Sequence, residues 1–268
     1  MQLTLAQLDI EPVATKSNRE SARSAVERAA SQESDLVVLP ELFTVGYFAF
    51  DSYARSAEPL DGQTVSMLAE TADEENVAVL AGSFVEDLGA SAAAGFETPE
   101  DDGLANTAVF LDRDGERRAV YRKHHLFGYD SAEQELLTPG EAIQTVEFEG
   151  FTVGTTTCYD LRFPELYRRL VDAGVTLTLV PSAWPYPRVE HWRLFPKARA
   201  VENLMYVGAA NGVGEFADAT LLGRSAVYDP WGTTLASAGD EATLVTATLD
   251  PERVKERRRS FPALADRR

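Results

Sequence analysis

Cys158, the single cysteine of the chain, lies between a threonine-rich segment and a predicted helix. Residues 151–157 have the composition of a strand, and the helix is predicted to begin at Pro164. A cysteine at such a junction can act as a nucleophile, because helix N-terminal amides lower the pKa of a thiol and the strand fixes its position. Free cysteine is also among the most buried residue types, so simple packing is the alternative.

Two further residues with chemical potential follow apolar segments. Glu41 comes directly after the run 36–39, where a carboxylate is costly to bury unless it is paired or protonated. Lys123 is one of four lysines in a chain with 21 arginines, which indicates a role for a compact ammonium rather than a planar guanidinium. The alternatives are a glutamate turned to solvent and a surface lysine. Together, Glu41, Lys123 and Cys158 could supply a base, a cation that stabilises an oxyanion, and a nucleophile. Their positions after strands fit such a site, because α/β proteins build their sites at the carboxyl ends of strands.

The elements that would position these residues alternate between strands and helices, which indicates an α/β protein with mixed sheets covered by helices. The acidic segment 86–103 is predicted to be a loop, and the arginine-rich tail at about 252–268 is predicted to be extended. Strands are predicted at 2–8, 36–39, 77–82, 104–111, 117–121, 144–148, 151–157, 176–180, 205–211, 225–229 and 243–249, and helices at 17–32, 62–75, 164–171 and 189–204.

Several segments, in this order, resemble the signatures of the carbon–nitrogen hydrolase (nitrilase) superfamily. The three main ones are Pro40-Glu41-Leu42, Lys123-His124-His125-Leu126-Phe127 and the segment 158–165, Cys-Tyr-Asp-Leu-Arg-Phe-Pro-Glu. Further matching segments are 181–184, 191–192 with 198–203, and 225–232. Each motif is short, but their shared order and spacing make the resemblance specific, and it extends from Leu3 to the C-terminus.

The resemblance implies an α/β fold in the form of a four-layer α-β-β-α sandwich, with two mixed sheets covered by helices. It implies a single carbon–nitrogen hydrolase domain over residues 1–268 that forms a homodimer or a higher homo-oligomer. It also implies a triad of Glu41, Lys123 and Cys158. Relatives often use a second glutamate after the lysine, for which Glu133 is the better positional match and Glu135 the rival.

The mechanism that the resemblance implies is hydrolysis of an amide through a thioester on Cys158. Glu41 would act as general base, while Lys123 and the backbone N–H of Tyr159 would stabilise the oxyanion. Tyr47 and Trp184 are expected to line the substrate pocket. The scheme requires no metal and no cofactor. The three histidines have no ligand-like pattern and are interpreted as structural or loop residues, and Arg162 and Glu165 are expected to hold the helix after Cys158 in place.

The motif around Cys158 is similar to that of the omega-amidase branch, whose members act on small carboxylated amides. An N-carbamoyl amino-acid amidohydrolase is the alternative, although Leu161 stands where that branch has the first of two arginines. A nitrilase is less consistent with Tyr159, since a tryptophan usually follows its cysteine. From other classes, a papain-like thiol hydrolase would need one of the histidines, and a catalytically inert binding module would not need the intact triad.

The charge of the chain limits its partners. It carries 43 acidic and 25 basic residues, for a formal net charge of −18. Such a surface repels nucleic acid and anionic membranes. The ligand that the resemblance implies is a small-molecule amide. The absence of an apolar run of 18 residues, of a basic apolar leader and of a cysteine pair fits a cytoplasmic protein. High negative charge with few lysines is also the composition expected in a high-salt cytoplasm.

Overall fold

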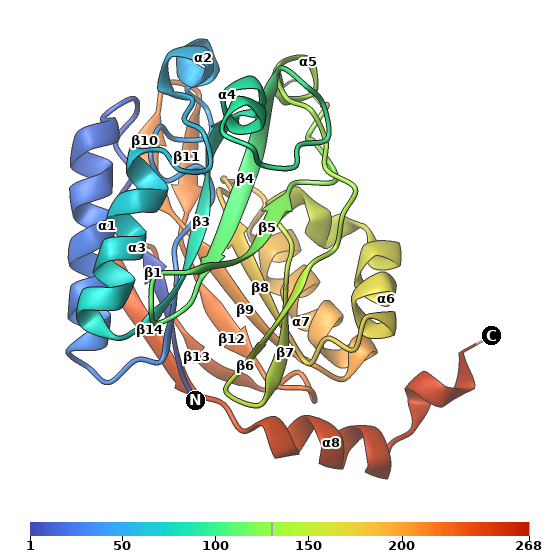
Figure 1. Ribbon diagram of the computed structural model, residues 1–268. Coiled ribbons are helices and arrows are strands. Elements are labelled where there is room, and N and C mark those ends of the chain that lie inside the picture. Colours follow the sequence, from blue (N-terminus) through green and yellow to red (C-terminus); the bar gives the residue numbers. More distant parts are fainter. Residues whose placement is uncertain (130, 268) are drawn as a thin grey trace.

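The computed structural model describes residues 1–129 and 131–267 and has two six-stranded sheets (Figure 1). The first has the order β14-β1-β2-β3-β4-β5, in which β1, β2 and β3 run parallel and the other pairs are antiparallel. Its strands are β1 (Gln2–Gln7), β2 (Leu36–Val38), β3 (Ala78–Asp87), β4 (Leu104–Leu111), β5 (Arg117–Arg122) and β14 (Thr243–Thr248).

The second sheet has the order β13-β12-β9-β8-β7-β6, with β7, β8 and β9 parallel. A two-stranded hairpin, β10 (Val213–Phe216) with β11 (Ala219–Leu222), stands apart from both sheets. The strands of the second sheet are β6 (Thr145–Phe148), β7 (Phe151–Thr155), β8 (Leu177–Ser182), β9 (Tyr206–Asn211), β12 (Ala226–Tyr228) and β13 (Thr234–Ser237).

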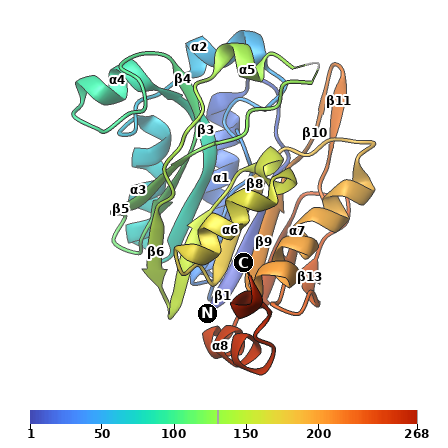
Figure 2. The ribbon, with the colours of Figure 1, turned by 90° about the vertical axis from the view of Figure 1, so that its right-hand side faces the viewer.

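Helices cover the outer faces of the two sheets, which gives the four layers of an α-β-β-α sandwich (Figures 1 and 2). The first sheet is covered by α1 (Thr15–Ala30) and α3 (Gln63–Glu75), and the second by α6 (Pro164–Asp172) and α7 (Val189–Asn203). Shorter helices are α2 (Tyr53–Ser56), α4 (Leu88–Ala93) and α5 (Glu133–Leu136), and α8 (Pro251–Ser260) lies near the C-terminus. The expectation of two mixed sheets covered by helices is therefore confirmed.

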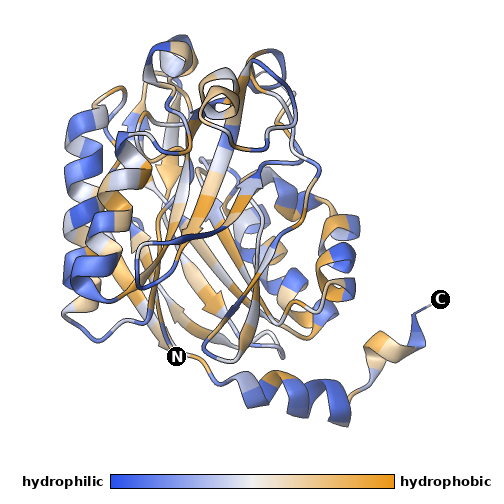
Figure 3. Ribbon diagram, in the orientation of Figure 1, coloured by the Kyte–Doolittle hydropathy of each residue, from blue (hydrophilic) through white to orange (hydrophobic). Residues whose placement is uncertain are grey.

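The core between the sheets is made mainly of aliphatic side chains with a few aromatic ones. Figure 3 shows hydrophobic residues along the strands of both sheets. Leu3 and Leu5 of β1 and Leu177 and Leu179 of β8 are fully buried there. Burying each such side chain stabilises the fold by about 1.5–3 kcal/mol relative to exposure. This packing fixes the two sheets against each other and so positions the loops at their ends.

Two sequence predictions about local structure are wrong. The tail at 252–268 is not extended, because α8 covers Pro251–Ser260 and a short 3₁₀ helix covers Ala263–Asp266; residue 268 lies outside the described residues. Asp250 caps α8 by accepting a hydrogen bond from the backbone N–H of Glu252, and Pro251 occupies its first turn. The segment 86–103 is not all loop either, because β3 extends to Asp87 and α4 follows.

Candidate active site

Glu41 is held by a tight turn that follows β2. The backbone N–H of Leu42 donates to Oγ of Ser83 (2.8 Å), and Leu42 has a positive φ of 46°. A Cβ on Gly82 would lie 2.0 Å from the carbonyl oxygen of Leu39, so only glycine allows β3 to pass this close to the turn. The Glu41 carboxylate is thereby directed inward, where it has no solvent exposure.

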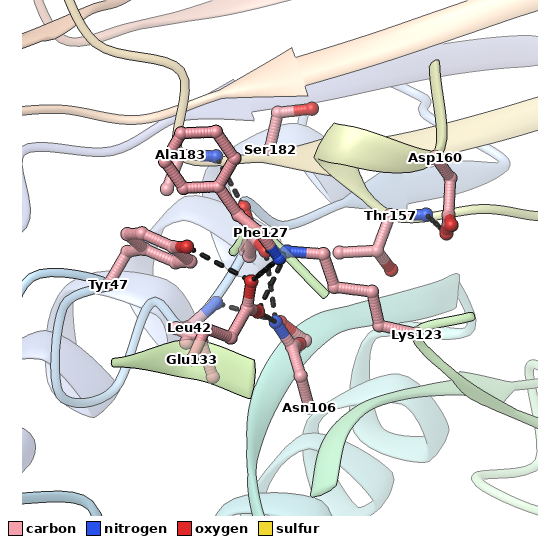
Figure 4. A network of polar contacts seen from close by, with 12 residues as sticks. Leu42, Tyr47, Asn106, Lys123, Phe127, Glu133, Thr157, Asp160, Ser182 and Ala183 are labelled. Carbon is pink, nitrogen blue, oxygen red and sulfur yellow. Dashed lines mark hydrogen bonds and ion pairs between the residues drawn. The ribbon is translucent and has the colours of Figure 1, made fainter. Parts of the chain in front are cut away.

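Lys123 lies just past β5, and its ammonium joins two carboxylates. Nζ lies 2.8 Å from Oε1 of Glu41 and 2.8 and 3.0 Å from the two carboxylate oxygens of Glu133. Lys123 is 1% exposed, and both glutamates are fully buried. Figure 4 shows Lys123 and Glu133 pointing toward each other, with Tyr47 beside them. Two carboxylates and one ammonium therefore share a single water-excluded cluster.

Cys158 stands at the start of a 3₁₀ turn (Cys158–Arg162) with a positive φ of 47°, a conformation that is rare outside glycine. Asp160 holds this turn. Its buried carboxylate accepts hydrogen bonds from the backbone N–H of Thr157 (2.9 Å) and from the Tyr121 hydroxyl (2.6 Å). It also contacts Nδ1 (2.7 Å) and accepts from the backbone N–H (3.0 Å) of His125. Asp160 thus ties the cysteine turn to the segment that carries Lys123.

Burial and neighbouring charge set the protonation states of the cluster. Burial raises the pKa of Cys158 well above its ordinary value; the Glu41 carboxylate raises it further, and Lys123 only partly opposes this. The expectation that helix amides lower this pKa is therefore wrong. Burial also raises the pKa of Glu41, against the opposing effect of Lys123. For Lys123 burial acts against the ammonium, but Glu133 and Glu41 outweigh it and raise its pKa.

The thiol lies at a pocket whose empty space, about 390 Å³, is partly open to solvent. Its walls are mainly aromatic, and two guanidinium groups add positive charge. Arg162 lies over the rings of Trp184 (5.1 Å) and Tyr159 (5.7 Å), and Arg188 lies over Phe127 (5.4 Å). The lining residues are Tyr47, Phe48, Lys123, Phe127, Cys158, Tyr159, Arg162, Ala183, Trp184, Pro185 and Arg188.

The structure brings together the residues that the motifs singled out. Glu41, Lys123 and Cys158 meet, and Glu133 rather than the exposed Glu135 contacts Lys123. Tyr159, Tyr47 and Trp184 all line the pocket, and the Tyr47 hydroxyl also donates to Glu133 (3.0 Å).

The expectations for the other polar residues hold in part. His125 stacks on Phe163 at 3.7 Å, and Nδ1 of His191 lies 3.1 Å from Arg162, which fits structural or loop positions. Arg162, however, faces the pocket instead of holding the helix. Glu165 is exposed and makes no side-chain hydrogen bond within the described residues.

Sequence reasoning missed three residues of the site. Asn106, in the middle of β4, donates from its amide nitrogen to Glu41 (2.9 Å) and Glu133 (3.3 Å). The available signal was a pair of polar residues, Asn106 and Thr107, in an otherwise apolar strand. Asp160 lies within the motif 158–165, which was the available signal for it, whereas Arg188 lies outside the motifs and carries no comparable signal.

No group of three or more His, Cys, Asp or Glu side chains arranged to hold a metal ion occurs within residues 1–129 and 131–267. None of the helices in these two ranges has both the length and the apolar character needed to cross a membrane.

A buried glutamate, lysine and cysteine at the ends of two packed sheets define a cysteine hydrolase of the α-β-β-α type. The chain belongs to the carbon–nitrogen hydrolase family, whose sequence model matches residues 2–259. It is 38% identical to a 2-oxoglutaramate amidase from Paenarthrobacter nicotinovorans over 88% of this chain and 79% of that protein. It is 33% identical to an omega-amidase from Homo sapiens over 100% of this chain and 95% of that protein.

The fold agrees with a solved amidase structure. A mutant of the amidase from Nesterenkonia sp. AN1, with acrylamide added to its active-site cysteine, superposes with a TM-score of 0.80 at 29% identity, over 99% of each chain. With these relatives, this chain is a cysteine-dependent amidase.

Proposed function

We propose that the protein hydrolyses the terminal amide of a small carboxylated molecule of the 2-oxoglutaramate type and releases ammonia. The observation that carries this proposal is the pair of guanidinium groups in the pocket. Within the described residues neither Arg162 nor Arg188 forms an ion pair with a carboxylate of the protein, in a chain where acidic residues greatly outnumber basic ones. The planar fork of arginine matches a carboxylate with two parallel hydrogen bonds.

The charges around Arg162 support an anionic ligand. Partial burial lowers the pKa of Arg162 because it disfavours the charged form, and the nearby charge of Arg188 lowers it further by repulsion. A bound carboxylate would relieve that repulsion. It would also be held at a fixed position relative to Cys158, which orients the amide at the other end of the substrate.

The reaction itself is assigned to the buried cluster. Glu41 takes the proton of Cys158, and the sulfur attacks the amide carbon. Lys123 and the backbone N–H of Tyr159 stabilise the oxyanion of the tetrahedral intermediate. Glu41 then returns the proton to the departing ammonia, and a thioester remains. Water, deprotonated by Glu41, hydrolyses the thioester. Glu133 holds Lys123 in place between the two carboxylates.

The test is ammonia release from a panel of five-carbon amides with and without a carboxylate. 2-Oxoglutaramate and glutaric acid monoamide carry a carboxylate, and pentanamide is the neutral counterpart. We expect kcat/KM to be higher for the carboxylated amides, and Arg162→Met and Arg188→Met each to reduce it by about 10- to 150-fold for these amides alone. Cys158→Ala is the inactive control. Equal rates for neutral and carboxylated amides would contradict the proposal.

The alternative substrates belong to the same experiment. N-carbamoyl amino acids also carry a carboxylate, but release ammonia from a carbamoyl group, and nitriles release it after two additions of water. If carbamoyl amino acids are turned over faster than the omega-amides, the protein is better assigned as an N-carbamoyl amino-acid amidohydrolase.

We also propose a homodimer or higher homo-oligomer in a salt-rich cytoplasm. Support comes from the net charge of −18 and from the exposed apolar side chains of Leu194, Val201 and Trp231. Sedimentation and thermal unfolding in about 2 M and about 0.1 M KCl test the two features, because screening of the acidic surface is strong only at high salt. A monomer whose melting temperature does not respond to salt would contradict them.

A further inference from the structure

Asn106 is an uncharged residue at the centre of the charged cluster. It is fully buried in β4, and its amide nitrogen donates to two carboxylates, at 2.9 Å to Oε1 of Glu41 and 3.3 Å to Oε1 of Glu133. Figure 4 shows Asn106 beside Lys123 and Glu133. Ionised carboxylates only accept hydrogen bonds, so the nitrogen must face them. Oδ1 of Asn106 is left without a partner among the described residues, which is unfavourable for a buried carbonyl.

The hydrogen bonds of Glu41 leave one position open. A carboxylate offers about four lone-pair positions, two on each oxygen. Oε1 accepts from Lys123 (2.8 Å) and from Asn106, and Oε2 accepts from the backbone N–H of Ala183 (2.9 Å). The position that remains is on Oε2, and the mutual effects of Glu41 and Cys158 on each other's pKa make the thiol the neighbouring proton donor.

We propose that Asn106 is a positioning residue that directs the thiol proton of Cys158 to Oε2 of Glu41. Because Asn106 and Lys123 fill both lone-pair positions of Oε1, the S–H bond breaks as an O–H bond forms at Oε2. The electron pair of the broken bond stays on sulfur, and the proton is later passed to the departing ammonia. This inference rests on the proposed role of Glu41 as the base.

The groups around Glu41 determine whether its pKa rises or falls when Asn106 is replaced. Those that face it are Lys123, Glu133, Cys158 and, further out, Tyr47 and Tyr53. Burial raises the pKa of Glu41 and Lys123 opposes this. The amide of Asn106 acts in the same direction as Lys123, because a donor stabilises the ionised carboxylate. Loss of the amide raises the pKa of Glu41, so activity is lost at a higher pH on the acidic side.

The experiment compares Asn106→Leu and Asn106→Asp with Thr107→Val. Thr107 is the next residue of the same strand, and its hydroxyl donates to the buried Glu86 (2.7 Å), away from the site. The two Asn106 variants keep the approximate shape of the side chain, and only Asn106→Asp adds a carboxylate. The readout is the pH dependence of kcat/KM, with kcat and KM measured separately and folding checked by circular dichroism.

We expect the acidic limb to move up by about one pH unit in Asn106→Leu and further in Asn106→Asp, with kcat reduced and KM little changed. Thr107→Val should retain the limb of the wild type. If the role of Asn106 is purely structural, Asn106→Asp should behave like the wild type, because it is the variant closest in shape. A folded Asn106→Asp variant whose acidic limb of kcat/KM is unmoved overturns the inference.

Glu41→Gln separates this inference from the proposed function. If Glu41→Gln retains turnover, the assignment of Glu41 as base fails. If it is inactive and the limb of the Asn106 variants does not move, only the role of Asn106 fails.

Discussion

Nζ of Lys123 lies 2.8 Å from Oε1 of Glu41, and the two side chains are 1% and 0% exposed. The pair could not persist in the interior without further partners, because each charge loses its hydration there. Glu133 and Asn106 supply those partners. The ionised groups proposed to take part in the reaction are therefore also the groups whose buried charges must be compensated for this part of the fold to be stable.

Lys123→Met is expected to lower both stability and activity. It leaves two buried carboxylates without their cation, which costs about 3–5 kcal/mol of the free energy of unfolding, and removal of an oxyanion donor lowers kcat by about 10²- to 10³-fold. The exposed Lys197 provides the matched control, Lys197→Met. Urea unfolding and ammonia release measure the two effects, and equal stability of the two variants would contradict the prediction.

The stability difference between wild type and Lys123→Met should depend on pH in a defined direction. Glu133 and Glu41 raise the pKa of Lys123 in the folded state, although burial alone would lower it. Such a group contributes its full stability below its unfolded-state value of 10.5 and loses it as the pH rises through the higher folded value. Urea unfolding at about pH 7, 9 and 11 should show a constant difference up to the alkaline range.

Glu133→Gln should move the acidic limb of the pH profile to lower pH. The negative charge of Glu133 raises the pKa of Glu41, so its removal lets Glu41 stay ionised in more acidic solution. We expect kcat to fall as well, by about one to two orders of magnitude, because Lys123 loses one of its two anchors. Glu135→Gln, at an exposed position of the same short helix, should match the wild type. The opposite result for the two variants would assign the second glutamate to Glu135.

Glu41→Gln should make Cys158 react with iodoacetamide at lower pH while turnover is lost. Glu41 raises the pKa of the thiol, second only to burial, and Lys123 lowers it. With the carboxylate neutralised, the thiolate forms more readily, and the thiolate is the species that is alkylated. The measurement is the alkylation rate between about pH 6 and 10 by mass spectrometry. An alkylation profile displaced to higher pH would contradict this account.

Asp160→Asn should destabilise the protein and reduce activity together. Both carboxylate oxygens of Asp160 accept hydrogen bonds, so an amide NH₂ in place of one oxygen would face donors. Loss of these buried contacts costs about 2–3 kcal/mol and loosens the turn that carries Cys158. Thermal unfolding and kcat give the two readouts, and Glu165→Gln, exposed on the next helix, is the control that should change neither.

The sequence predicted most of the architecture because its strands are strongly apolar. The central strands follow directly from that pattern. The hairpin of β4 and β5 follows instead from the turn sequence Asp112-Arg113-Asp114-Gly115, because β5 itself contains three arginines. The error at the C-terminus has an identifiable reason. Asp250 and Pro251 are ordinary start signals of a helix, but charge along the tail concealed them, since only Val254 is buried there.

The residues of the site that lie in sequence motifs were predictable. Properties that depend on the burial of a side chain or on the direction in which it points were not. Glu41, Lys123 and Cys158 stand at strand ends, where a motif locates them. The pKa of Cys158 was predicted in the wrong direction because burial and Glu41, not helix amides, dominate it. The direction of the long Arg162 side chain depends on aromatic rings that only the fold brings near.

The turn at Glu41 has a mechanical consequence. Its carboxylate is fixed from the first sheet by Lys123 and Asn106 and from the end of β8, in the second sheet, by the backbone of Ala183. A slip of one sheet over the other by about 1 Å would break one set of contacts while leaving most of the aliphatic core packed. Turnover is therefore sensitive to the alignment of the two sheets. We expect it to be lost under mild denaturation before either sheet unfolds.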